Sequence, residues 1–151
     1  QLGSRPNASG ITGVYGVTPA GAVFLVDGSL DKPNGIALSP DGTVLYVSDY
    51  SGRIGAYPVG ADGATGARTE FASGIAVPDG MTVDCGGNVY AAQHEAGVIH
   101  VLAPNATPLG QITVAPSLTN VGFGGADGKT LYATAAKTLY AIPMNVPGHP
   151  Y

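Results

Sequence analysis

Residues 33–42 read PNGIALSPDG, and residues 78–84 repeat this pattern as PDGMTVD. The second copy starts 45 residues after the first (78 minus 33), and a weaker third copy, TNVGFGGADG, starts 41 residues later (119 minus 78). Each copy is followed by a tight turn and then by a strand-like run that contains tyrosine. Repeats of about 40 to 45 residues that hold several short strands are typical of β-propeller blades.

The rest of the chain shows no helical periodicity of useful length. Runs rich in β-branched residues instead alternate with Gly, Pro and Asp turns, which predicts an all-β chain. The predicted strands cover residues 13–17, 22–26, 35–38, 44–48, 54–58, 68–71, 80–83, 88–92, 98–102, 110–114, 121–124, 130–134 and 138–142.

These strands predict one incomplete propeller domain over residues 1–151, equal to about half of a six-bladed ring. It has two full four-stranded blades and two partial ones. The predicted parts are a partial blade at 13–30, blades at 33–77 and 78–116, a last blade at 119–143 without its fourth strand, and a Pro-rich tail at 144–151.

Six blades of about 43 residues would need about 260 residues, so a closed ring does not fit in this chain. An open half-ring would leave apolar blade faces and strand edges exposed. We therefore expect the missing N-terminal blades to come from a second chain, from a homodimer mate or from another part of a longer protein.

Composition excludes several classes of partner. The formal net charge is −4, only 11% of residues are charged, and no basic cluster occurs, so we expect no nucleic-acid partner. The apolar runs are much shorter than the roughly 18 residues of a membrane-spanning helix, so we expect no membrane partner. Scarce lysine with abundant Gly, Ala and Thr favours a secreted or periplasmic protein.

Three residues outside the repeated motifs are candidates for chemistry or modification. Cys85 is the single cysteine, which excludes an internal disulfide and a Cys-based zinc site, and we expect it to be a small buried hydrophobe. Asn7 and Asn105 begin glycosylation sequons, which matter only if the protein passes through a secretory pathway.

The three ordered motifs resemble those of the gluconolactonase and regucalcin (senescence marker protein) family, and the similarity extends over nearly the whole chain. The resemblance implies a six-bladed β-propeller that hydrolyses a sugar lactone with one divalent metal ion. Calcium is the first choice of ion, and zinc, magnesium and manganese are alternatives. Related propellers hydrolyse aryl esters, phosphotriesters or other lactones, and sequence does not choose among these substrates.

Asn34 and Asp79 hold equivalent positions in the first two repeats. Propeller geometry would bring both to the channel mouth, where an amide oxygen and a carboxylate suit a hard cation. Alternatively both are turn residues, because PNG and PDG are also turn sequences. The family resemblance implies that both are metal ligands and that Asp79 is also the catalytic proton acceptor. The family's third ligand is a Glu from a blade absent here, and Glu70 and Glu95 do not match its motif.

Further candidates surround the same mouth. The loops between second and third strands place Tyr50, Gln93 and His94 on the rim as candidate substrate contacts, with a solvated rim residue as the alternative for His94. Asn120 is taken as the repeat equivalent of the two predicted ligands and is a fourth candidate contact. Structural roles in turns on the opposite face are predicted for Asp41, Asp84 and Asp127.

A second class of function stays open: a non-catalytic propeller that binds calcium or a partner protein through the same mouth. An acidic ligand supplied by the missing first blade would favour the enzyme, and its absence would favour the binding module.

Overall fold

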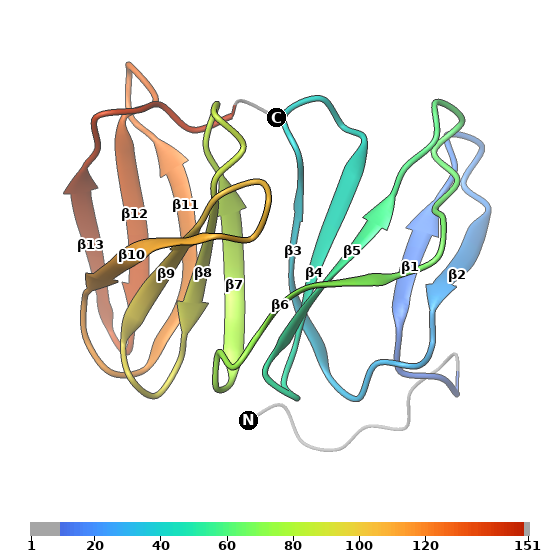
Figure 1. Cartoon of the computed structure of the whole chain (residues 1–151), viewed down its shortest axis with the longest axis horizontal. Coiled ribbons are helices and arrows are strands. Elements are labelled where there is room, and N and C mark those ends of the chain that lie inside the picture. The colour runs from blue at the N-terminus through green and yellow to red at the C-terminus, as the bar shows by residue number, and fades with distance from the viewer. Residues whose placement is uncertain (1–9, 150–151) are drawn as a thin grey trace.

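The computed structural model describes residues 10–149, which form four antiparallel sheets placed side by side (Figure 1). The first sheet pairs β1 (Val14–Val17) with β2 (Val23–Asp27). The second contains β3 (Pro33–Leu38), β4 (Val44–Asp49), β5 (Arg53–Pro58) and β6 (Thr69–Ser73). The third contains β7 (Pro78–Val83), β8 (Val89–Gln93), β9 (Val98–Leu102) and β10 (Pro108–Thr113). The fourth contains β11 (Leu118–Gly124), β12 (Thr130–Ala135) and β13 (Thr138–Pro143).

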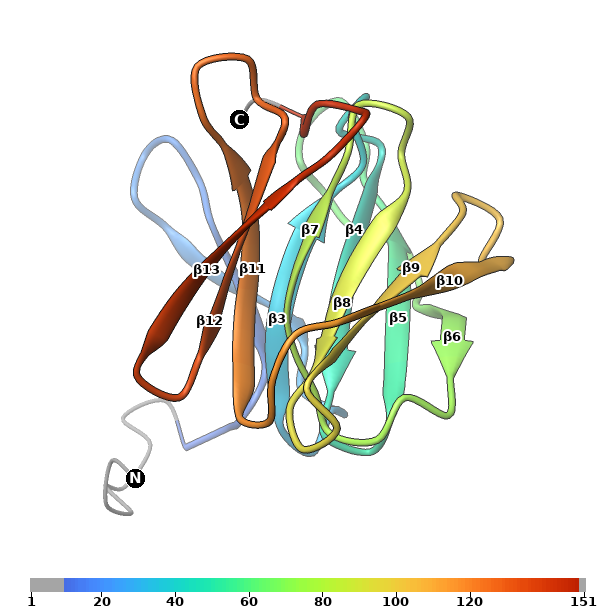
Figure 2. The same ribbon diagram turned by 90° about the vertical axis from the view of Figure 1, so that its left-hand side faces the viewer.

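This architecture confirms the all-β prediction of two full blades and two partial ones. The first strands of the last three sheets lie next to one another (Figure 2), and β7 lies between β3 and β11 (Figure 1). Strand order within each sheet follows the chain, so every blade is a simple meander that runs outward from these inner strands. Within the described residues, no helix is long and apolar enough to cross a membrane.

The blades are held together by apolar layers between their faces. In β8, Val89 and Ala91 pack towards the second sheet, while Tyr90 and Ala92 pack towards the fourth. All four are buried, because neighbouring blades cover both faces of the third sheet. The alternation of side chains along a strand therefore serves two separate cores in this blade.

The fourth sheet, in contrast, is covered on one face only. In β12, Leu131 and Ala133 are buried, whereas Tyr132 and Thr134, which alternate with them, are exposed. Leu139 on β13 is 63% exposed, and Val17 at the other end of the row of blades is 68% exposed. The two ends of the half-ring thus present the apolar surfaces that the sequence predicted.

The inner strands begin earlier than predicted. β3 starts at Pro33 in place of residue 35, β7 at Pro78 in place of residue 80, and β11 at Leu118 in place of residue 121. Each strand carries a bulge or register shift directly after its first residue, and this shift accommodates the motif residues inside the strand. The PNG and PDG motifs are therefore parts of strands.

The hydrogen bonds at the start of the inner strands correct the alignment of the third repeat. The carbonyls of Lys32, Val77 and Ser117 accept from the amides of Tyr50, His94 and Ala136, respectively. Asn34, Asp79 and Thr119 each stand two residues after these carbonyls. The predicted equivalence of Asn120 with Asn34 and Asp79 is therefore wrong. Thr119 takes that position. Asn120 aligns with Gly35 and Gly80, which follow Asn34 and Asp79 in the other two repeats.

The three turn aspartates have the structural roles that were predicted. Asp41 and Asp127 each accept the amide two residues further on, from Thr43 and Lys129. Asp84 is fully buried, and its carboxylate accepts from the amides of Gly86 and Asn88, from Asn88 Nδ2 and from Tyr90 Oη. These side chains satisfy turn amides that have no partner in a strand.

Residues near Asp84 show one correction and one long-range contact. Cys85 is exposed, so its predicted burial is wrong, because the residue after Asp84 turns outward where β7 ends. The segment after β13 returns to this turn, and Pro147 O accepts from the Cys85 amide while Val83 O accepts from the His149 amide. Asn105 lies exposed in the turn between β9 and β10, and Asn7 lies outside the described residues.

Replacing Tyr90 by phenylalanine should reduce the free energy of unfolding by about 1 to 2 kcal/mol, because the buried Asp84 carboxylate would lose a 3.0 Å hydrogen bond. Urea unfolding followed by circular dichroism measures the change. Tyr132→Phe is the matched control, because Tyr132 takes the same register position in the fourth sheet and is 37% exposed. Equal stability losses in the two variants would contradict the assigned role of the Tyr90 hydroxyl.

Candidate functional site

The inner strands line an open cavity of about 390 Å³. Its lining comes from residues 34–36 of β3, 79–82 of β7 and 119–123 of β11, together with His149. Three of the six predicted site residues lie in this lining: Asn34, Asp79 and Asn120. The fold therefore brings together polar groups that are separated by up to 86 residues in sequence (120 minus 34).

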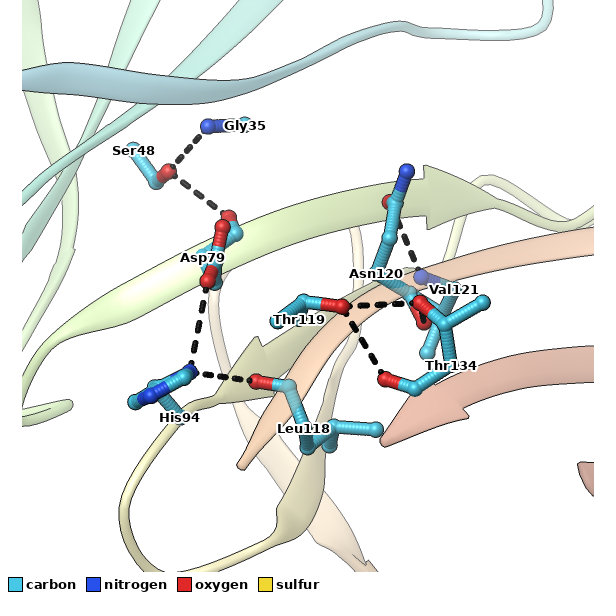
Figure 3. A network of polar contacts seen from close by, with 9 residues as sticks. All are labelled: Gly35, Ser48, Asp79, His94, Leu118, Thr119, Asn120, Val121 and Thr134. Carbon is cyan, nitrogen blue, oxygen red and sulfur yellow. Dashed lines mark hydrogen bonds and ion pairs between the residues drawn. The ribbon is translucent and has the colours of Figure 1, made fainter. Parts of the chain in front are cut away.

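Asp79 is the one acidic residue in the cavity lining formed by the described chain. Its side chain is 15% exposed, and its Oδ2 lies 3.5 Å from Nδ1 of His94 (Figure 3). Burial raises the pKa of the Asp79 carboxyl, while the His94 imidazole, the Asn34 side-chain amide and the Gly80 N–H act in the opposite direction. Asp79 is thus a partly desolvated carboxyl group that several donors still orient.

Neighbouring blades approach closely at this point because both motifs contain glycine. A Cβ on Gly35 would overlap the Asp79 carbonyl oxygen, and one on Gly80 would overlap the side chain of Asn120. Ser48 Oγ connects the first two blades, since it accepts from the Gly35 amide at 2.7 Å and donates to the Asp79 carbonyl at 2.9 Å. The absence of side chains at 35 and 80 is what allows Asn34, Asp79 and Asn120 to line one cavity.

Asn120 has a defined orientation. Its Oδ1 accepts from the Val121 amide at 2.9 Å, so the Nδ2 group points the other way, as Figure 3 shows. Asn120 lines the cavity, and its Nδ2 group carries two N–H donors that are not used in this hydrogen bond. Thr119, which precedes it, binds Thr134 through its hydroxyl.

The three rim residues differ in what they contact. His94 reaches Asp79, although it is not part of the cavity lining. Gln93 is directed to the next strand, where its Oε1 lies 2.8 Å from Nε2 of His100. Tyr50 is 40% exposed, and the centre of its ring lies 5.7 Å from the Lys32 amine. Neither Gln93 nor Tyr50 is brought to the cavity.

Sequence reasoning missed Ser48. Its hydroxyl is fully buried and joins the backbones of Gly35 and Asp79. The signal was a small hydroxyl residue at the end of the otherwise apolar run VLYVS, residues 44–48, where a buried polar group needs hydrogen-bond partners.

The donor chemistry of the mouth fits part of a metal shell. Asn34 and Asp79 offer an amide oxygen and a carboxylate, which are ligands for hard divalent ions. Within residues 10–149, no group of three or more His, Cys, Asp or Glu side chains is placed to hold an ion. Glu70 forms an ion pair with Arg53, in which Glu70 Oε2 lies 3.6 Å from Arg53 Nε. Any further acidic ligand must therefore come from outside this part of the chain.

The curated proteins that resemble this chain include three that are named as lactonases. Over 86% of its length the chain is 36% identical to the gluconolactonase of Zymomonas mobilis. It is also 33% identical to the 6-deoxy-6-sulfogluconolactonase of Pseudomonas putida over 80% of its length, and 30% identical to a pentonolactonase of Haloferax volcanii over 89%. It spans 40%, 49% and 48% of these relatives, respectively, or about half of their length.

Solved structures show the same relation. The gluconolactonase XC5397 of Xanthomonas campestris is 33% identical, with a TM-score of 0.76 over 89% of this chain and 44% of that one. The calcium-binding protein regucalcin of Agrobacterium tumefaciens, at 23% identity, shares the fold with a TM-score of 0.78 over 91% of this chain and 53% of that one. The family model SMP-30/Gluconolactonase/LRE-like region matches residues 2–137. With the repeats, the half-ring of blades and these matches in agreement, the chain belongs to the SMP-30/gluconolactonase/LRE-like family.

Proposed function

We propose that this chain supplies part of the active site of a metal-dependent lactone hydrolase that acts on a sugar lactone. The observation that carries the proposal is the meeting of Asn34, Asp79 and Asn120 in one cavity. The proposal is supported by three relatives, each at least 30% identical, that are named as lactonases of sugar-derived substrates.

In this proposal Asn34 and Asp79 hold one divalent ion through their side-chain oxygens, with calcium as the first choice. A bound divalent ion polarises an ester carbonyl and lowers the pKa of a coordinated water. The remaining ligand is an acidic side chain from a blade that lies outside this chain. Two protein ligands alone would hold a divalent ion weakly, because calcium takes six to eight oxygen ligands.

The protein's own groups then account for proton movement and orientation. Asp79 accepts a proton from the attacking water, and the burial that raises its pKa makes it a stronger base than an exposed carboxylate. The water oxygen bonds to the lactone carbonyl carbon, the ring C–O bond breaks, and the ring oxygen takes the proton back from Asp79 to become a hydroxyl group of the open-chain acid. Asn120 Nδ2 donates a hydrogen bond to an oxygen of the substrate.

We also propose that further blades complete this single domain and cover its ends. The exposed apolar side chains at both ends of the half-ring, Val17 and Leu139 among them, support this proposal. So does the outer edge of β13, which pairs with no other strand in the part of the chain that the structure describes. Functional tests therefore require the complete protein with all of its blades.

Replacing Asn34 by alanine should raise the concentration of calcium needed for half-maximal hydrolysis of D-glucono-1,5-lactone at least about tenfold, which corresponds to about 1.4 kcal/mol. The reason is the loss of one oxygen ligand from the shell. Calcium-dependent initial rates of the complete protein, corrected for spontaneous hydrolysis, measure this shift.

Asn105→Ala is the matched amide control, because Asn105 lies exposed in the turn between β9 and β10. An unchanged calcium requirement in Asn34→Ala would contradict the assignment of Asn34 as a ligand. Hydrolysis that is independent of any divalent ion would contradict the proposed metal dependence as a whole.

A further inference from the structure

His94 is connected to the inner strand that carries Asp79 and to the next inner strand, β11. Its amide donates to the Val77 carbonyl, directly before β7, and its carbonyl accepts from the amide of Leu118, the first residue of β11. Its ring Nδ1 lies 3.1 Å from the Leu118 carbonyl oxygen and 3.5 Å from Asp79 Oδ2 (Figure 3). The backbone therefore fixes where the imidazole stands relative to the carboxylate.

The partners of Nδ1 determine the tautomer of this histidine. A carbonyl oxygen can only accept, so Nδ1 must carry the hydrogen that it donates to Leu118 O. This N–H group lies 3.5 Å from Asp79 Oδ2, on the side of the ring that faces the carboxylate. His94, the Asn34 amide and the Gly80 N–H all lower the pKa of this carboxyl group.

The corresponding positions of the other blades show that the turn itself does not need histidine. Tyr50 and Ala136 occupy the same place in the second and fourth sheets and make the same backbone hydrogen bond to the start of their inner strands. Their inner strands carry the uncharged Asn34 and Thr119 where β7 carries Asp79. Within the described residues, imidazole thus occurs at the one mouth position that faces a carboxylate.

We infer that His94 is a positioning residue for Asp79, an inference that rests on the proposed function of Asp79. The imidazole is held by Leu118 O with Nδ1 3.5 Å from Oδ2, so it limits the orientations of the carboxylate before substrate arrives. His94 acts on the reaction through Asp79 and does not contact the substrate.

The first test needs no measurement of activity. Long-range ¹⁵N–¹H correlation spectra of the metal-free protein, recorded above the titration range of histidine, distinguish the two tautomers of neutral imidazole. The signals of His94 are identified by their absence from the spectrum of the His94→Asn variant. We expect the Nδ1–H form, and an Nε2–H form for His94 would overturn the inference.

The second test compares variants of the complete protein. His94→Ala should lower kcat for D-glucono-1,5-lactone, and the affinity for calcium measured by calorimetry, each by about 10- to 100-fold, as expected when a group that orients a ligating carboxylate is lost. The KM should stay unchanged. His94→Asn should recover most of both quantities, because the Asn amide nitrogen lies close to the place of Nδ1, whereas His94→Gln should not, because its amide extends to the place of Nε2.

His100→Asn is the matched histidine control, since His100 lies on β9 outside the cavity. A higher KM with unchanged kcat in His94→Ala would make His94 a substrate contact and would overturn the inference. So would unchanged calcium affinity in His94→Ala. If Asp79 variants lose hydrolysis while His94→Ala matches the wild type, the inference about His94 fails alone; if Asp79 variants stay active, the proposed function fails first.

Discussion

Replacing Asp79 by asparagine in the complete propeller is expected to lower kcat for lactone hydrolysis by about 10²- to 10⁴-fold. The amide has the shape of the carboxylate and keeps one oxygen, so packing in the partly buried site is retained. It cannot accept a proton, and it carries no charge to bind an ion. Asp79→Ala, which also removes the oxygen ligand, is expected to abolish measurable hydrolysis.

Initial rates with D-glucono-1,5-lactone in a pH-stat, at saturating calcium, measure this effect. Asp127→Asn is the matched control because Asp127 holds a turn amide of Lys129 on the opposite face and lies outside the cavity. Full activity of Asp79→Asn would show that no proton is transferred to this side chain. It would also mean that the catalytic base of the hydrolase is a residue other than Asp79.

Replacing Gly35 by alanine is expected to reduce the free energy of unfolding by about 3 kcal/mol, at the upper end of the usual cost of overpacking. A Cβ at this position would overlap the Asp79 carbonyl oxygen and would lie 3.0 Å from Ser48 Oγ and 3.1 Å from the Gly80 carbonyl carbon. Two of these neighbours are backbone atoms, so no side-chain rotation relieves the clash. The strands β3 and β7 would have to separate.

Gly122→Ala is the matched control, because Gly122 lies on the inner strand β11 and a Cβ there would meet nothing within 4 Å. Chemical unfolding of both variants gives the comparison. A Gly35→Ala protein as stable as Gly122→Ala would contradict the close approach of the two blades. Because the clash displaces Asp79, we also expect Gly35→Ala to lose hydrolytic activity at temperatures where it is still folded.

The blades and the position of Asp79 could be predicted from the sequence because the repeat period is long and its two clearest copies both contain proline and glycine. The third copy could not be aligned in the same way. Leu118 replaces the proline and Asn120 replaces the glycine, so a shift of one residue gives an equally good match of letters. Only the hydrogen bonds that begin each inner strand show that Thr119 corresponds to Asp79.

The rim was harder to predict than the inner strands. Gln93 and His94 are consecutive, yet one reaches His100 on β9 and the other reaches Asp79. Which side chain turns inward depends on where β8 ends and on the geometry of the following turn, and neither follows from residue type. The burial of Cys85 was wrong for a related reason, since a single step past the end of β7 decides which way a side chain points.

The contacts between blades have a consequence for motion within the site. The third and fourth sheets are joined at the mouth by His94 and Leu118 and at the opposite face by Pro147 and His149. Ser48 joins the second sheet to the third in a similar way, through Gly35 and the Asp79 carbonyl. Ties at both of these blade boundaries favour movement of the three sheets as one rigid body. The separations of Asn34, Asp79 and His94 are therefore expected to be preset before a ligand arrives.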